Sequence, residues 1–138
     1  MTEGGSPDAQ LPAELSADFD RFRAQLTDQR ERDPRWAGLG NADALATWRA
    51  YGRLLYERSA DLALVAKGDR DAIYTRHVLD SLNPLTLYQR PPASLLDIGS
   101  GGGLPGIPLA IAWPDSRVYL LESKERKAGF LEQTVRLL

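Results

Sequence analysis

The chain has 138 residues and a formal net charge of −2 at pH 7, and 43% of its residues are hydrophobic and 26% charged. This length and composition predict one globular domain, and the slightly acidic balance gives no sign of a phosphate-binding surface over the whole molecule. Because the chain has no cysteine, disulfides, thiolate zinc sites and cysteine nucleophiles are excluded. The N-terminus lacks the features of a signal peptide, and no apolar run approaches the ~18 residues that span a membrane. We therefore expect a cytoplasmic protein with no membrane partner.

Residues 1–40 predict a variable leader with one short helix. Residues 1 to about 12 mix Gly, Ser, Pro, Asp and Gln, a composition typical of disorder. From Ala13 to about Asp28, apolar residues recur at steps of three and four, which predicts an amphipathic helix. Its buried face comprises Leu15, Phe19, Phe22 and Leu26. Pro34 restricts the residue before it and ends the charged connector that follows.

Residues 41–92 predict a helical segment. Asn41 or Asp43 can cap a helix that runs to about Arg58, because both side chains accept hydrogen bonds from the first free amides of a helix. We interpret its apolar stripe as core packing rather than as a cofactor site; the stripe comprises Ala44, Leu45, Trp48, Tyr51, Leu54 and Leu55. A third helix is expected from Asp71 to about Leu82, with Asp69 as its cap and Pro84 beyond its end.

In residues 93–138 the helical periodicity gives way to short apolar runs, and this pattern predicts the start of an α/β domain. Ser94 to Ile98 is a short apolar run that ends in glycines, a pattern typical of a parallel strand buried on both faces. A helix from Leu104 to Ala112, a turn at Trp113, a strand from Arg117 to Leu121 and a helix from Lys124 to Leu138 follow.

The motif DIGSGGGLPG at residues 97–106 carries the functional signal. Glycines there allow positive φ and let a ligand lie against the backbone, and so many glycines are unfavourable in a turn that serves structure alone. The motif fits the dinucleotide pattern G-x-G-x-x-G and also the methyltransferase pattern D-x-G-x-G-x-G. Asp97 favours the second, since a carboxylate repels a pyrophosphate but complements the ammonium and sulfonium of S-adenosylmethionine. Glu122, after the second strand, can accept hydrogen bonds from ribose hydroxyls in either case.

Three stretches resemble the RsmG (GidB) family, which methylates a guanine N7 in 16S rRNA of the small ribosomal subunit. They are DIGSGGGLPGIPLAI at 97–111, RHVLDS at 76–81 and LLESKERKAGFL at 120–131. The resemblance covers about residues 43–138. The chain departs from the family's pattern at Gly102, where the family usually has proline, and this makes the loop looser.

The resemblance implies a class I methyltransferase fold of the Rossmann-like type, with S-adenosylmethionine as cofactor, 16S rRNA as partner and no metal. It implies that Asp97 contacts the cofactor's amino end and that Glu122 holds its ribose. It also implies that Gly99, Gly101 and Gly103 line the cofactor and that Leu104 packs against it. Arg76 and His77 have two open interpretations: contacts near the cofactor or RNA, or an ion pair with Asp80 that only locks a helix to the sheet.

The mechanism implied by this family needs no catalytic acid or base, because guanine N7 loses no proton when it is methylated. Catalysis is then mainly positioning in a site that excludes water. The last helix is locally basic at Lys124, Arg126, Lys127 and Arg136, which is either a phosphate contact or a solvated helix face.

Relative to that family, we expect the chain to stop after its second strand–helix unit, and the full-length form to be a monomer. Two interpretations stay open: an rRNA methyltransferase, or a remnant that binds cofactor weakly and does not catalyse. A protein that binds NAD is a third alternative. By itself the chain is expected not to be an active, well-folded enzyme, because the outer edge of its first strand would lack a neighbour.

Overall fold

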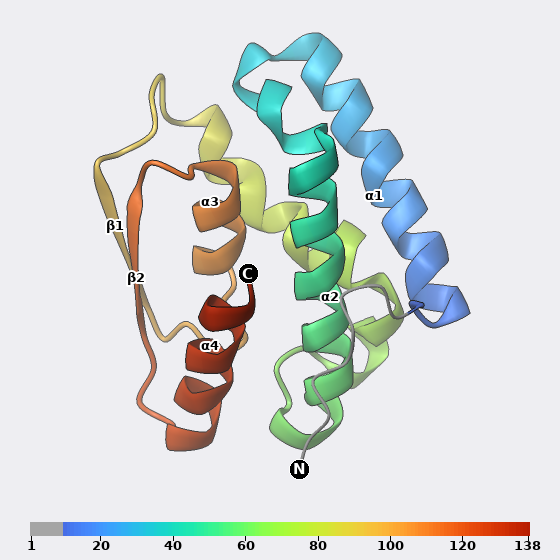
Figure 1. Cartoon of the computed structure of the whole chain (residues 1–138), viewed down its shortest axis with the longest axis vertical. Coiled ribbons are helices and arrows are strands. Elements are labelled where there is room, and N and C mark those ends of the chain that lie inside the picture. The colour runs from blue at the N-terminus through green and yellow to red at the C-terminus, as the bar shows by residue number, and fades with distance from the viewer. Residues whose placement is uncertain (1–9) are drawn as a thin grey trace.

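The computed structural model describes residues 10–138, so the first part of the predicted leader lies outside the described residues. The chain is a mixed α/β molecule in which helices precede a small parallel sheet (Figure 1). In Figure 1 the two strands form one edge of the molecule, and all labelled helices lie on the same side of them.

Helix α1 spans Ala13–Arg32 and is longer than predicted. Its apolar positions are buried as expected, with Leu15, Phe22 and Leu26 fully inaccessible to solvent. The helix continues past Asp28 and ends where the backbone of Asp33, the residue before Pro34, becomes extended. Asp33 then accepts a hydrogen bond from the Arg35 amide at the start of a 3-10 helix, η1 (Pro34–Gly40).

Helix α2 spans Ala42–Leu62 and forms the centre of the helical part. Of the two predicted caps, Asn41 is the one used, and its side chain accepts a hydrogen bond from the Ala44 amide at 2.8 Å. The helix runs beyond the predicted end at Arg58 and stops at Ala63, which has a left-handed conformation with φ 51° and ψ 48°. It therefore gains a further turn, and Leu62 in that turn is buried.

The third helix predicted from Asp71 to Leu82 is wrong as a single α-helix. The segment instead forms a 3-10 helix η2 (Lys67–Ala72), a π-helical turn η3 (Ile73–Val78) and a 3-10 helix η4 (Asp80–Thr86) that contains Pro84. The buried carboxylate of Asp18 on α1 accepts a hydrogen bond from the Tyr74 amide at 2.7 Å and one from the Thr75 hydroxyl at 2.5 Å. These tertiary bonds satisfy the first turn of η3, whose amides have no partner within the helix.

Both predicted strands are confirmed at their predicted bounds. Strand β1 (Ser94–Ile98) pairs in parallel with β2 (Arg117–Leu121), in a register that sets Ile98 opposite Leu121. Helix α3 (Gly106–Ala112) begins two residues after the predicted start, and α4 (Glu125–Leu137) lies within one residue of its predicted bounds.

The prediction that the strand is buried on both faces is wrong. Alternate residues along each strand are half-buried towards the helices, whereas Leu96 is 56% and Ile98 73% exposed on the other face. Tyr119 and Leu121 of β2 are exposed in the same way. The physical reason is coverage, because the helices pack on one face only (Figure 1).

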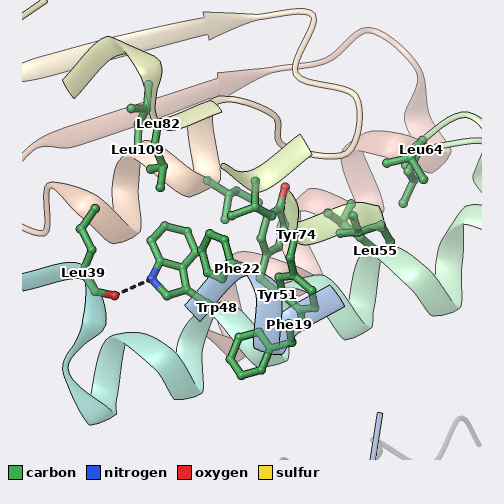
Figure 2. Close-up of a cluster of buried hydrophobic side chains, with 14 of the residues drawn as sticks. Phe19, Phe22, Leu39, Trp48, Tyr51, Leu55, Leu64, Tyr74, Leu82 and Leu109 are labelled. Atoms are coloured by element: carbon green, nitrogen blue, oxygen red, sulfur yellow. Dashed lines mark hydrogen bonds between the residues drawn. The ribbon is translucent and has the colours of Figure 1, made fainter. Parts of the chain in front are cut away.

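The core lies between α1, α2 and the helices next to the sheet. Figure 2 shows Trp48 beside Phe22, with its indole N–H donating to the Leu39 carbonyl at 3.1 Å. Trp48 and Tyr51 are completely buried, so the predicted packing role of the α2 stripe is confirmed at these positions. The same cluster reaches Ile107 of α3 and Phe130 of α4, and it therefore supports the helices that flank the sheet.

Candidate functional site

The predicted site residues on the two strands meet at one edge of the sheet. We call residues 99–103, which leave the carboxyl end of β1, the glycine loop. The amides of Gly99 and Ser100 both donate to the carbonyl of Leu121, at 2.8 and 3.1 Å, so the loop begins bound to the end of β2. Because parallel strands end at the same edge, Asp97 and Glu122 flank this loop.

The glycines of the loop have two different structural roles. Gly99, Gly101 and Gly103 have φ values of 76°, 55° and 89°, in the region that L side chains rarely adopt. A Cβ at Gly99 or Gly101 would meet no atom within 4 Å, whereas one at Gly103 would overlap the side chain of Ile107. The first two glycines therefore present bare backbone to open space, and the third allows close packing of α3.

Asp97 holds the beginning of α3. Its Oδ2 atom accepts a hydrogen bond from the Gly106 amide at 3.0 Å, and a Cβ at Gly106 would approach that oxygen to 2.7 Å. A carboxylate can accept about four hydrogen bonds, so this one leaves capacity for a ligand. The side chain is half-buried and lies on the helix-facing side of β1.

Glu122 closes the other side of the loop. Its Oε2 accepts from the Gly101 amide at 2.8 Å, and its Oε1 accepts from the Lys124 amide at 3.0 Å. These two bonds, that from Lys124 first, hold the pKa of Glu122 below its ordinary value, and the positive charge of Lys127 acts in the same direction. The group is therefore a carboxylate at neutral pH and orients the amide of Gly101.

Leu104, Arg76 and His77 take other positions. Leu104 precedes α3 and packs, half-buried, against the hydrophobic core. Arg76 and His77 lie on η3, where both bind Asp69, His77 at 3.1 Å; the hydrogen bond from Arg76 is the main cause that lowers the pKa of Asp69. The predicted ion pair with Asp80 is wrong, and so is the predicted cap at Asp69, because Asp69 is the partner of both basic side chains.

Sequence reasoning missed one residue that contacts the loop, Tyr51 of α2. Its hydroxyl donates to the carbonyl of Gly102 at 2.8 Å. Burial, and secondly the charge of Asp97, raise the pKa of Tyr51 well above its ordinary value. The helical stripe marked Tyr51 as core, and no local signal joins it to a residue 51 positions later.

The basic residues of α4 are partly committed to acidic neighbours. Arg136 binds Glu132 at 2.6 Å, one turn earlier on the same helix. Lys127 lies close enough to Glu122 to influence its pKa. The two interpretations of this helix, a phosphate contact or a solvated face, therefore stay open for the remaining cations Lys124 and Arg126.

An apolar cavity of about 640 Å³ lies on the helix-facing side of β2. Its walls include Leu39, Ile111, Val118, Leu120 and Val135, and no residue of the glycine loop lines it. The cavity reaches Gly106, whose amide binds Asp97, so it adjoins the candidate site without including the glycine loop. Within residues 10–138, no cluster of three or more His, Cys, Asp or Glu side chains is arranged to hold a metal, and no helix is long and apolar enough to cross a bilayer.

Comparison with known proteins gives a consistent match. The family model GidB, described as rRNA small subunit methyltransferase G, matches residues 44–138. The chain is 45% identical over 86 residues to ribosomal RNA small subunit methyltransferase G of Granulibacter bethesdensis, covering 62% of this chain and 40% of that protein. The protein of the same name from Pseudomonas aeruginosa is 42% identical over 93 residues, which cover 67% of this chain and 43% of that protein. The one from Geobacillus thermodenitrificans is 36% identical over 96 residues, which cover 69% of this chain and 40% of that protein. The chain thus spans about two fifths of the length of these relatives.

Proposed function

The chain belongs to the GidB family, the family of rRNA small subunit methyltransferase G, and from this premise we propose that its glycine loop binds S-adenosylmethionine. The observation that carries the proposal is the bare backbone of Gly99 and Gly101, open to solvent between two carboxylates. When bound, this cofactor supplies a methyl group activated by its sulfonium.

The residues present fit this cofactor better than a dinucleotide. Asp97 places negative charge beside the start of the loop, which would repel a pyrophosphate, whereas Glu122 is compatible with either ligand. The same charges complement an ammonium and a sulfonium, and a carboxylate accepts hydrogen bonds from ribose hydroxyls. In the proposal Glu122 holds the ribose, Asp97 contacts the amino end, and Gly99, Gly101 and Gly103 line the ligand with Leu104 at its side.

We also propose that residues 93–138 are the start of a class I methyltransferase domain and that residues 41–92 are the helical segment packed on one of its faces. The order strand, glycine loop, helix and parallel strand supports this fold. The glycine loop at the carboxyl end of β1 is where such sheets bind their ligands.

The proposed reaction is methylation of a guanine N7 in 16S rRNA. The in-plane lone pair of N7 would form the new bond to the methyl carbon while the methyl–sulfur bond breaks, and the sulfur would leave as a neutral thioether, S-adenosylhomocysteine. No proton leaves N7, so the protein supplies no general base. The contribution of this chain is to hold the methyl donor in one orientation. The target guanine must lie in an accessible loop, because the deep groove of an A-form helix hides N7.

Titration calorimetry with S-adenosylmethionine and with NAD tests the cofactor class. We expect the first to bind more tightly, and tighter binding of NAD would overturn the proposal. Asp97→Ala and Glu122→Ala should each weaken binding by about tenfold to a hundredfold through lost charge-assisted hydrogen bonds. Glu132→Ala is the matched control, because its carboxylate binds Arg136 on the surface of α4; it should leave the affinity unchanged.

A strain that lacks the gene tests the substrate. Its 16S rRNA should lose the cleavage by borohydride and aniline that marks 7-methylguanine, and an unchanged cleavage pattern would exclude this substrate. Returning residues 1–138 to the strain then separates the two interpretations of the chain. Restored methylation indicates methyl transfer, whereas cofactor binding without restoration indicates a binding module that does not catalyse.

A further inference from the structure

The glycine loop is held from the core side by helix α2. Tyr51 is completely buried, and its hydroxyl donates to the carbonyl of Gly102, the fourth residue of the loop, at 2.8 Å. Gly102 is itself buried, and a Cβ there would lie 2.9 Å from Leu55 and 3.2 Å from Leu64. Tyr51 and its neighbours therefore form a surface against which the middle of the loop rests.

The loop needs such a restraint because its own sequence provides little. All residues from Gly99 to Gly103 except Ser100 are glycine, and glycine loses more backbone freedom on ordering than any other residue. Glu122 fixes the Gly101 amide, and the Gly103 amide donates to Ser100 at 2.7 Å. The Tyr51 hydroxyl binds the carbonyl of Gly102, which belongs to the same peptide group as the Gly103 amide, so this peptide is held at both its oxygen and its nitrogen.

Burial, together with the nearby charge of Asp97, keeps the Tyr51 hydroxyl a donor. The phenol is fully buried and lies near the carboxylate of Asp97, and both effects raise its pKa well above the ordinary value. A neutral phenol in contact with a backbone carbonyl can only donate. In the bond to Gly102, Tyr51 is therefore the donor and the carbonyl the acceptor over the physiological pH range.

We propose that Tyr51 is a positioning residue for the cofactor: its buried hydroxyl holds the glycine loop in the binding conformation before the ligand arrives. The inference rests on the proposed function, because it assigns the loop to S-adenosylmethionine. A loop that is ordered in advance loses less entropy on binding, so the bond increases affinity without touching the ligand.

The test compares Tyr51→Phe with Tyr74→Phe. Tyr74 is also completely buried, and its hydroxyl donates to a backbone carbonyl, that of Arg49, at 2.7 Å. Each substitution removes one oxygen and keeps the ring, so the two variants should lose similar thermal stability. Only Tyr51→Phe should weaken S-adenosylmethionine binding, by about tenfold, the factor that corresponds to one buried hydrogen bond.

Amide hydrogen exchange of the ligand-free protein gives a second readout that does not need the cofactor. Tyr51→Phe should accelerate exchange at Gly101 and Gly103, whereas Tyr74→Phe should leave both at the wild-type rate. Equal exchange at these amides in the two variants would overturn the inference, and so would equal affinity. If Tyr51→Phe does not fold, its hydroxyl supports the whole molecule rather than the loop, and the inference is wrong. If the wild-type chain does not bind S-adenosylmethionine, the proposed function fails, while the exchange rates still decide whether Tyr51 orders the loop.

Discussion

The helical part and the sheet bury similar apolar residues to very different extents. Trp48 and Phe22 are completely inaccessible among the helices, whereas Leu96 and Ile98 on β1 are 56% and 73% exposed. The helices α1 and α2 cover each other with residues of this chain, but the strands are covered on one face only (Figure 1). An apolar side chain is therefore buried only where another element packs against it. Truncation of an apolar side chain should lower the free energy of unfolding more in the helical part than on the exposed face of the sheet.

Removal of a large core side chain should have the greatest effect. Trp48→Ala should lower the free energy of unfolding by about 3–5 kcal/mol, because it leaves a cavity and an unpaired carbonyl at Leu39. Ile98→Ala, on the exposed face of β1, should change it by less than about 0.5 kcal/mol. Urea unfolding of the two variants measures both values. A loss at Ile98 as large as that at Trp48 would show that the exposed face is covered in solution, for instance by another copy of the chain.

Removal of the carboxylate of Asp18, in the helical part, should also destabilise the protein more than removal of the carboxylate of Asp97, on the sheet. Asp18 is completely buried and accepts from the Tyr74 amide and the Thr75 hydroxyl, so Asp18→Ala should cost about 2–4 kcal/mol by leaving these donors unsatisfied. Asp97→Ala removes one bond at the half-buried start of α3 and should cost about 1 kcal/mol. Chemical unfolding at neutral pH compares them. Equal losses would mean that α1 is not anchored to η3 through Asp18.

Two glycines separate the effect of space from that of backbone conformation. A Cβ at Gly52 would overlap the ring of Tyr74, so Gly52→Ala should cost about 1–3 kcal/mol through overpacking. Gly101 has open space around it but a φ of 55°, so Gly101→Ala should cost about 1 kcal/mol through backbone strain. Thermal unfolding gives these values. Calorimetry should add that only Gly101→Ala blocks S-adenosylmethionine, because its methyl group fills the open side of the loop; unchanged affinity would place the ligand elsewhere.

The sheet and the family were predictable because their signals are local. The apolar runs of β1 and β2 end in glycine or polar residues, and the bounds Ser94–Ile98 and Arg117–Leu121 agree with the structure. The motif at residues 97–111 indicated the family that the comparison then matched over residues 44–138. The meeting of Asp97 and Glu122 at one edge followed from parallel pairing alone.

The remaining features depend on contacts between distant residues. Where the third helix is interrupted, the Tyr74 amide donates to Asp18, 56 positions earlier. The bond between Tyr51 and Gly102 spans 51 positions. No periodicity or motif encodes such pairs, since periodicity states which face is apolar and not what lies against it.

A small stabilising effect is expected at the junction between the helical part and the sheet. Ala63 ends α2 in the left-handed region and directs the chain to Leu64, which packs behind Gly102. Because glycine adopts this conformation without a steric penalty, Ala63→Gly should stabilise the protein by about 0.5–1 kcal/mol, a rise in Tm of about 2–5 °C. Ala60→Gly is the matched control: Ala60 is an exposed residue inside α2, and there the same substitution should destabilise by about 0.5–1 kcal/mol. If Ala63→Gly raises the Tm and Ala60→Gly lowers it, the stabilisation comes from the backbone conformation at the junction. The same sign at both positions would mean that the turn at Ala63 is not left-handed in solution, and the support that Leu64 gives to the glycine loop would have to be reconsidered.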